Sequence, residues 1–250
     1  MMPGNLFRLQ MLTASGDRRH LILRIGISFL LAMPFIFVQM PARAKAAGIV
    51  MVILFTSFFG AAVGHARLRA EMRLTRLMLL PTSRWIIWLD LVLASTLSRL
   101  VPAVIVLSGF VLINGQNIMP ASMINLFGLL CNSLILLTLL GMGTGTLARS
   151  NGEVHLFGAL VCAMIAFVSG VAPLPKRLLW LKAAAAFNPI GRLLAFLTNM
   201  GNGATYLSNF EFVFASLVSA AVIFAVVIRW ISGGMGKTEK LDSQDIKDDN

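Results

Sequence analysis

Few residues in this chain have types and spacing that could do chemistry. Gly236, Lys237 and Thr238 match the end of a phosphate-binding loop, in which backbone amides and a lysine hold the phosphates of a nucleotide. The first glycine of that G-x-x-x-x-G-K-S/T pattern would fall at Ile231, at the end of an apolar run rather than a buried strand. The remaining tail, which ends at Asn250, is too short for a nucleotide-binding domain. We therefore expect any ATP hydrolysis to come from another chain.

The patterns of intramembrane enzymes are also missing. The sequence has no H-E-x-x-H helix, no G-x-S-x-G elbow and no paired aspartates within its apolar runs. Glu153 and His155 lie close together, but on a short loop, and Asp90 has no acidic neighbour. We expect that the chain is not an enzyme and that it has no catalytic residues.

The cysteines and histidines do not form a ligand set. Cys131 and Cys162 lie inside apolar runs with no second cysteine or histidine at ligand spacing. His20, His65 and His155 are scattered singly at the edges of apolar segments. We expect no disulfide, no metal site and no cofactor in this chain.

The composition describes a membrane protein. The chain is 58% apolar and only 12% charged, with a mean hydropathy of +0.84, whereas soluble domains carry about 25% charged residues. These values exclude a cytosolic enzyme, and they exclude a disordered chain, which has too little apolar surface to fold. The net charge of +11 comes from basic residues that lie mostly in short gaps between apolar runs. We interpret them as signals of membrane topology rather than as a nucleic-acid surface.

Apolar runs long enough to cross a bilayer recur along the chain, because a core about 30 Å thick needs roughly 20 helical residues. They cover 21–40, 47–66, 86–113, 123–147, 154–172 and 211–231. A further apolar region, 174–200, is cut by Pro189 and dotted with lysines and arginines, which leaves two pieces too short to cross. We therefore predict an all-α integral membrane protein with six transmembrane helices and a re-entrant helical hairpin between spans 5 and 6.

The basic residues also predict the orientation. If the N-terminus is cytoplasmic, most lysines and arginines fall on the cytoplasmic side, including the arginine-rich loop 67–85. Residues 1–20 are then a cytoplasmic interfacial segment, 21–231 the transmembrane domain and 232–250 a polar cytoplasmic tail. The first run also imitates a signal peptide that is cleaved after small residues, but its apolar core is longer than such peptides need. We expect a retained first helix.

The loop between the second and third runs has an amphipathic pattern. One set of residues recurs at helical spacing as an apolar ridge, and arginines fall on another face. The ridge comprises Leu68, Met72, Thr75 and Leu79, and the basic face comprises Arg69, Arg73 and Arg76. The pattern predicts an amphipathic helix that stops at Pro81. It could rest on anionic lipid headgroups, or it could dock a cytoplasmic partner protein.

Two motifs resemble a known family. Glu71, Thr75, Leu79 and Pro81-Thr82-Ser83-Arg84 resemble the E-x-x-G-T-(x)n-L-x-x-P-x-S-R signature of ABC-2 type permeases, the membrane subunits of ATP-binding-cassette exporters. A second set resembles that family's S-G-x-x-x-P…l-P…n-P passage after the fifth span. It comprises Ser169-Gly170-Val171, Pro173, Pro175, Lys176 and Asn188-Pro189-Ile190. The chain departs from the pattern at Leu74, where the family usually has glycine, and in the close spacing of Pro173 and Pro175.

The resemblance implies a transport function. It implies a translocation path in the inner (plasma) membrane, coupled through 67–85 to a separate cytoplasmic ABC ATPase subunit that binds ATP and Mg. It also implies a second permease copy or a homologous permease as partner, and it implies that 174–200 forms two short re-entrant helices on the outer side. Membrane lipids are further partners, and no nucleic acid is expected. The rival is a carrier or scaffold subunit that is not coupled to ATP.

Three features within the runs could matter for assembly or transport. Gly60 with Gly64, and Gly141 with Gly145, are G-x-x-x-G pairs, which allow helices to approach closely within one subunit or between two. Arg99 lies roughly 16 Å beyond Trp88, near the bilayer midplane if that tryptophan marks the interface. An arginine there should face the bundle interior, a translocation path or an acidic partner, helped by Ser95 and Ser98, or it should snorkel towards the cytoplasmic headgroups.

Overall fold

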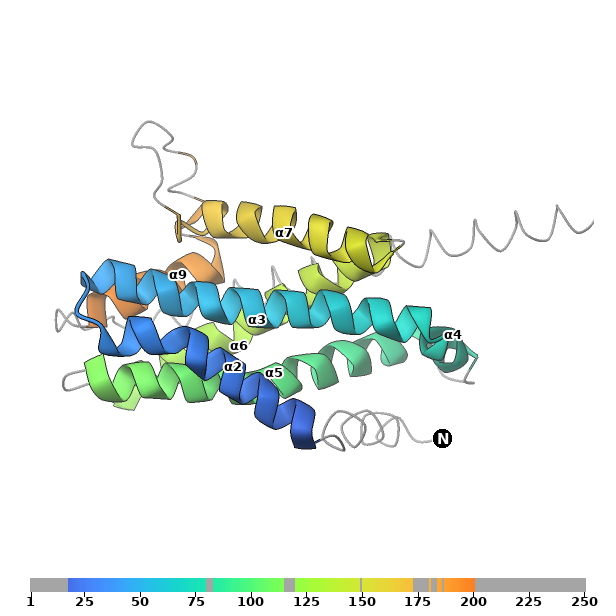
Figure 1. Ribbon diagram of the computed structural model, residues 1–250, viewed down its shortest axis with the longest axis horizontal. Coiled ribbons are helices and arrows are strands. Elements are labelled where there is room, and N and C mark those ends of the chain that lie inside the picture. The colour runs from blue at the N-terminus through green and yellow to red at the C-terminus, as the bar shows by residue number, and fades with distance from the viewer. Residues whose placement is uncertain are drawn as a thin grey trace, which may run out of the picture.

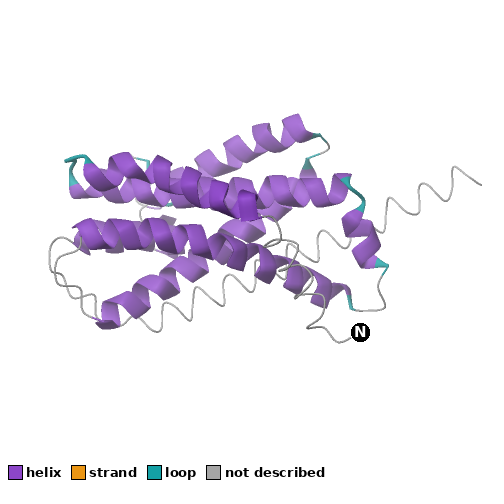
Figure 2. Cartoon of the chain, turned by 60° about the horizontal axis from the view of Figure 1, so that its bottom comes forward, coloured by secondary structure: helices purple, strands orange, loops and turns teal. Residues whose placement is uncertain are grey.

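A computed structural model describes residues 18–79, 83–114, 120–148, 150–172, 180, 184–185 and 187–200. The regular structure of these residues is helical (Figures 1 and 2). The helices are α2 (Arg18–Phe37), α3 (Ala42–Ala70), α4 (Arg73–Met78), α5 (Arg84–Asn114), α6 (Pro120–Leu147), α7 (Asn151–Val168) and α9 (Pro189–Asn199). The expected sixth span, 211–231, and the expected tail, 232–250, lie outside the described residues.

Three of these helices are long and apolar enough to cross a membrane. They are Ala42–Ala70, Trp85–Asn114 and Met123–Leu147, and the shortest of them has 25 residues. At about 1.5 Å per residue, each exceeds the thickness of a bilayer core. The apolar parts of α2 and α7, Ile22–Phe37 and Gly152–Val168, are shorter. The chain is therefore a helical membrane protein with three helices of spanning length among its described residues.

Helix α3 lies at the centre of the bundle. It packs against α2, α5, α6, α7 and α9 (Figure 1), and it contributes the fully buried side chains of Ile49, Leu54 and Phe58 to the main core. At one end of the bundle Lys45, near the start of α3, donates a hydrogen bond of 2.7 Å to Asn114 at the end of α5. The ends of the two long helices are thus tied together.

Helices α3 and α6 approach each other closely at Gly141 and Gly145. A Cβ atom on Gly141 would lie 2.5 Å from the Phe58 carbonyl oxygen, and one on Gly145 would lie 2.5 Å from the Ala62 carbonyl oxygen. Only glycine permits this approach, because real Cβ atoms essentially never come so near another heavy atom. This G-x-x-x-G pair therefore packs within one subunit.

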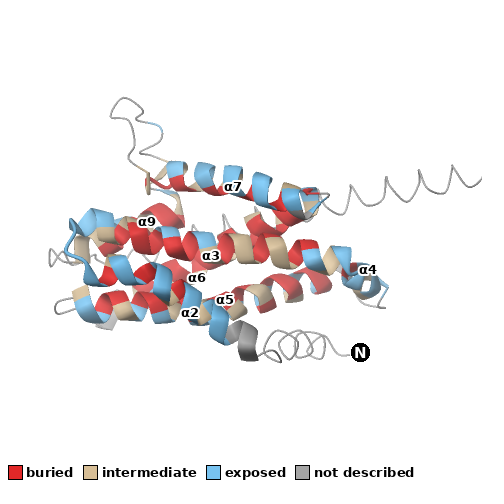
Figure 3. Ribbon diagram, in the orientation of Figure 1, coloured by how far each residue is buried: buried red, intermediate tan, exposed pale blue. Residues whose placement is uncertain are grey.

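The outer helices present apolar side chains away from the bundle. Leu156, Leu160 and Met164 of α7 are 75%, 61% and 60% exposed, and α2 exposes a similar surface (Figure 3). In water such a surface would promote association, but acyl chains can cover it. The burial pattern therefore agrees with a bilayer environment.

The segment after the second run differs from the single amphipathic helix that its periodicity predicts. Helix α3 continues to Ala70, so the connection to α5 is shorter than 67–85. The chain then turns at Met72, whose φ of 57° is left-handed, and the short helix α4 follows. The ridge is also different, because Leu74 is buried whereas Met72 and Leu79 are exposed. Because the chain changes direction at Met72, the residues after it face other directions than they would in one continuous helix. The predicted ridge assumed such a continuous helix.

Candidate functional site

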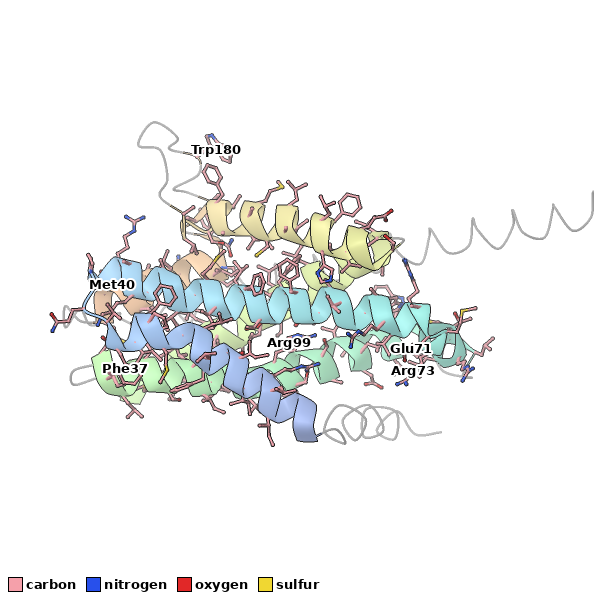
Figure 4. All side chains as sticks on the ribbon, in the orientation of Figure 1. Phe37, Met40, Glu71, Arg73, Arg99 and Trp180 are labelled. Carbon is pink, nitrogen blue, oxygen red and sulfur yellow. The ribbon has the colours of Figure 1, made fainter. Side chains whose placement is uncertain are left out.

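Residues 71–79, which we name the connecting segment, form an exposed surface at one end of the bundle. Figure 4 shows Glu71 and Arg73 at this end, beyond the core of α3 and α5. Arg73 Nε lies 2.8 Å from Glu71 Oε2, and both side chains are more than half exposed. Such an exposed ion pair contributes little stability, so its carboxylate and guanidinium remain available to a partner. Thr75 is exposed too, and Leu79 is 81% exposed.

The predicted members of this site are thus partly brought together. Glu71, Thr75 and Leu79 all lie on the connecting segment and are all exposed. Pro81 lies outside the described residues, and Arg84 begins α5. An acidic group, a basic group and an exposed leucine therefore lie on one short exposed segment, which has the groups to meet either a partner protein or lipid headgroups.

The connecting segment is anchored from beneath by an apolar cluster. Leu74 is only 5% exposed, and it belongs to a cluster with Ile87 and Trp88 of α5 and Met142 of α6. Leu74 stands where the resembling family usually has glycine, yet here it is helical and has φ below zero. Its side chain attaches the segment to two of the long helices.

A second attachment comes from Arg69, which the sequence analysis placed on an exposed basic face. Its Nη1 donates a hydrogen bond to the Thr146 carbonyl and its Nη2 donates one to the Ala148 carbonyl. These carbonyls end α6, where backbone groups lack helical partners and attract positive charge. Arg69 therefore ties the end of α3 to the end of α6. The sequence carried no signal for this cap, because the second run was predicted to end at 66 and only the structure places Arg69 in the last turn of α3.

The interior holds Arg99, which is only 7% exposed. Figure 4 shows it midway along the bundle. Its Nη1 donates hydrogen bonds to the backbone carbonyl and the hydroxyl of Ser95, one helical turn earlier. Arg99 is thus buried inside the bundle, with Ser95 as its hydrogen-bond partner.

The guanidinium of Arg99 faces the other glycine pair. A Cβ atom on Gly60 would lie 3.2 Å from Arg99 Nε, and one on Gly64 would lie 3.9 Å from its Nη2. Nε has no hydrogen-bond acceptor. Within the described part of the chain, no carboxylate forms an ion pair with this guanidinium. Gly60 and Gly64 therefore leave space for the side chain of Arg99, whereas Gly141 and Gly145 allow the backbone of α3 to pack against α6.

A buried histidine, which the sequence placed at the edge of an apolar run, lies one residue beyond this pair. His65 is 2% exposed, neither ring nitrogen has a hydrogen-bond partner, and its ring centroid lies 5.4 Å from that of Trp88. The described residues contain no group of three or more His, Cys, Asp or Glu side chains that could hold a metal ion. His65 thus has an aromatic neighbour but no ligand set around it.

The second motif joins the end of α7 to the start of α9. Gly170 has a left-handed φ of 72°, which turns the chain after α7. Asn188 Nδ2 donates a hydrogen bond of 2.8 Å to Ser169 Oγ, and its Oδ1 accepts one of 3.0 Å from the Ile190 amide. Asn188 is therefore the N-cap of α9, and Pro189 occupies a first-turn position that suits its fixed φ.

The structure thereby brings together residues that lie far apart in the motif. Helix α9 packs back against α3 and α6, and its inner side chains are buried, including Leu193 and Leu197. Pro173 and Pro175 lie outside the described residues, so the path between the two ends of the motif is not described. Of the expected re-entrant hairpin over 174–200, the structure describes α9 as its one long element, and the hairpin itself stays a prediction.

Comparisons with known proteins add no relative. No family model matches the chain, and a search of curated proteins finds no significant match. The fold and the apolar helices define a membrane protein of helical class.

Proposed function

We propose that this protein is the permease subunit of an ATP-binding-cassette exporter of the ABC-2 type, working in the inner (plasma) membrane with both termini cytoplasmic. The observation that supports it best is the connecting segment, which exposes Glu71, Thr75 and Leu79 at the end of a helical membrane bundle. These are the residues that carry the resemblance to that family. ATP and Mg would bind to a separate ATPase subunit, and a second permease would complete the transporter.

The attachments of the connecting segment suggest how force could pass into the membrane. A partner that pushed on Leu79 or Glu71 would act on a segment held by Leu74 to α5 and α6. Arg69, two residues before the segment, bonds to the carbonyls that end α6. Displacing the segment would therefore tilt α3, α5 and α6 together rather than bend a free loop. This rigid linkage suits the conversion of ATPase closure into helix motion.

The alternative is a carrier or scaffold subunit without ATP coupling. A secondary carrier usually has repeated halves and ionisable groups near the midplane that bind the coupling ion. Arg99 is a cation with no ion-pair partner among the described residues, so it does not supply a site for Na⁺ or H⁺.

The test is co-purification with an ATPase chain that contains a full phosphate-binding loop. Glu71→Ala and Leu79→Asp should each reduce both capture of the ATPase and the ATPase activity stimulated by transport. Arg43→Ala is a matched control, because Arg43 is exposed at the other end of α3. If both variants keep capture and stimulation, the connecting segment is a lipid-facing surface and the proposal fails.

A further inference from the structure

We propose that the connecting segment binds a protein surface that carries carboxylates between two apolar pockets, which we name the acidic surface. The acidic surface would belong to the ATPase subunit, so this inference rests on the proposed function. The arginines of the segment would steer the partner into place, and its exposed apolar side chains would hold the complex.

Helix α4 has two faces of different chemistry. Leu74 is buried, and Leu77 and Met78 are partly buried against the same cluster of α5 and α6 side chains. Arg73 and Arg76 are exposed, and residues three apart lie on one side of a helix. The inner face of α4 thus packs on the protein itself, whereas its outer face is open to another molecule.

Two exposed apolar side chains flank the outer face. Met72 is the N-cap of α4 and is 62% exposed, and Leu79 is its C-cap and is 81% exposed. At about 1.5 Å per residue, the two caps lie roughly 10 Å apart along α4. A partner gains binding free energy from these side chains only by burying them. It therefore needs an apolar pocket at each end of α4.

The charge of this surface is positive. Arg73 and Arg76 on the segment and Arg67, one turn before it, are exposed. The only acidic residue of the segment is Glu71, whose Oε2 lies 2.8 Å from Arg73 Nε. Neither Arg67 nor Arg76 forms an ion pair with the described residues. Two arginines are thus left without a carboxylate, and a partner surface of negative charge complements them.

The length of α3 favours a protein over the bilayer as the occupant. Lys45, near the start of α3, marks one headgroup layer, because lysines at helix ends lie at the interface. From there α3 continues to Ala70 for roughly 37 Å, about 7 Å more than the thickness of a hydrocarbon core. Figure 1 shows α4 at this far end of α3. Met72 and Leu79 therefore lie beyond the acyl chains, and anionic headgroups would repel Glu71.

The two kinds of group would act at different steps. Opposite charges attract over about a Debye length and speed the encounter of two proteins, so the arginines should raise the association rate. Buried apolar side chains resist separation, so Met72 and Leu79 should lower the dissociation rate. Salt should therefore slow the association of the complex.

The experiment measures the association rate of the full permease in nanodiscs with its ATPase, the purified chain with a full phosphate-binding loop that co-purifies with it. For the native protein we expect this rate to fall about tenfold between about 50 and about 500 mM NaCl, because salt screens the charges. Arg76→Glu should associate about tenfold more slowly than the native protein at low salt and equally fast at high salt.

Two control variants separate charge from structure. Arg76→Lys keeps the charge on the same exposed position and should associate at the native rate. Arg43→Glu makes the same charge change as Arg76→Glu at the other end of α3, where Arg43 is exposed, and it should also associate at the native rate. Equal association rates for the native protein and Arg76→Glu, with capture of the ATPase intact, would overturn the acidic surface and leave the proposed function standing. If the native permease binds no such ATPase, the proposed function fails and the acidic surface fails with it.

A second measurement tests the bilayer as the occupant. A fluorescent amino acid replaces Leu79 or, in a separate variant, Leu160 of α7, which is 61% exposed. The permease is then placed in nanodiscs of lipids with brominated acyl chains and no ATPase. Bromine should quench the fluorophore at position 160 and leave the one at position 79 bright. Equal quenching at the two positions would show that lipid covers the segment and would overturn the proposal.

Discussion

The two G-x-x-x-G pairs of this protein have the same spacing but different surroundings. Gly141 and Gly145 meet carbonyl oxygens of α3, each at 2.5 Å from a notional Cβ. Gly60 and Gly64 instead meet the guanidinium of Arg99, at 3.2 Å and 3.9 Å. The first pair brings two backbones together, and the second pair leaves space for a buried charge.

The difference shows that a G-x-x-x-G motif specifies only where side chains are absent from a helix. What fills the space is decided by the facing helix: α3 offers backbone and small residues to the glycines of α6, whereas α5 offers a long cation to the glycines of α3. A G-x-x-x-G pair in a membrane helix is therefore not evidence for dimerisation by itself. In this chain both pairs are occupied within one subunit.

The largest expected effect is at the closed pair. Gly141→Ala and Gly145→Ala should each destabilise the protein by about 1–3 kcal/mol, because the new methyl group would overlap backbone atoms that cannot rotate away. Thermal unfolding in detergent checks this. Gly26→Ala is the control, since a Cβ there meets nothing within 4 Å. Equal unfolding temperatures for all three variants would mean that α3 and α6 are not packed as closely as described.

At the open pair we expect loss of function without loss of fold. Arg99→Leu should abolish transport while insertion and yield remain normal, because the leucine removes the buried charge. Arg99→Lys should retain part of the activity, and Arg99→Gln should retain less. Transport by reconstituted vesicles is the measurement. Equal activity in all three variants would leave Arg99 with no part in the translocation path.

The long helix ranges could be predicted from the sequence because apolar runs of spanning length leave few alternatives. Helices α3, α5 and α6 overlap the expected runs 47–66, 86–113 and 123–147. The predicted contact of Arg99 with Ser95 also depends only on helical spacing, because residues four apart share a face. These features are local.

The remaining features depend on tertiary contacts. The turn at Met72 could not be predicted, because glycine is the residue that usually indicates a left-handed backbone and the sequence has methionine there. The extension of α3 through Arg67 and Arg69 was missed because charge ended the apolar run although arginine is a good helix former. The hydrogen bond between Asn188 and Ser169 joins two helices, and the periodicity of a sequence does not predict how two helices lie relative to each other.

The α3–α6 contact can be loosened at its end as well as at its glycines. Arg69→Met should destabilise the protein by about 1–2 kcal/mol, because it removes two charge-assisted hydrogen bonds to the carbonyls that end α6. Arg67→Met is the matched control, since Arg67 is exposed on the same turn of α3. Chemical or thermal unfolding would compare the two. If both variants have the same stability, the Arg69 bonds contribute nothing.

The smallest expected effect is at the turn before α4. Met72→Gly should be neutral or stabilise by up to about 1 kcal/mol, because glycine adopts a φ of 57° without the steric cost that methionine bears. Met72→Val should destabilise the turn, since a β-branched residue tolerates this backbone least. The Met72→Val variant should therefore unfold at a lower temperature than the native protein. The Met72→Gly variant should unfold at the same temperature as the native protein or at a higher one.

The most direct test of the permease account is site-specific photocrosslinking in cells that also contain the ATPase chain. Leu79 and Leu112 are almost equally exposed, at 81% and 82%, but Leu79 lies on the connecting segment and Leu112 near the far end of α5. A photoreactive residue at position 79 should crosslink to the ATPase, and one at position 112 should not. Crosslinking from position 112, or from neither position, would contradict the coupling role of the connecting segment.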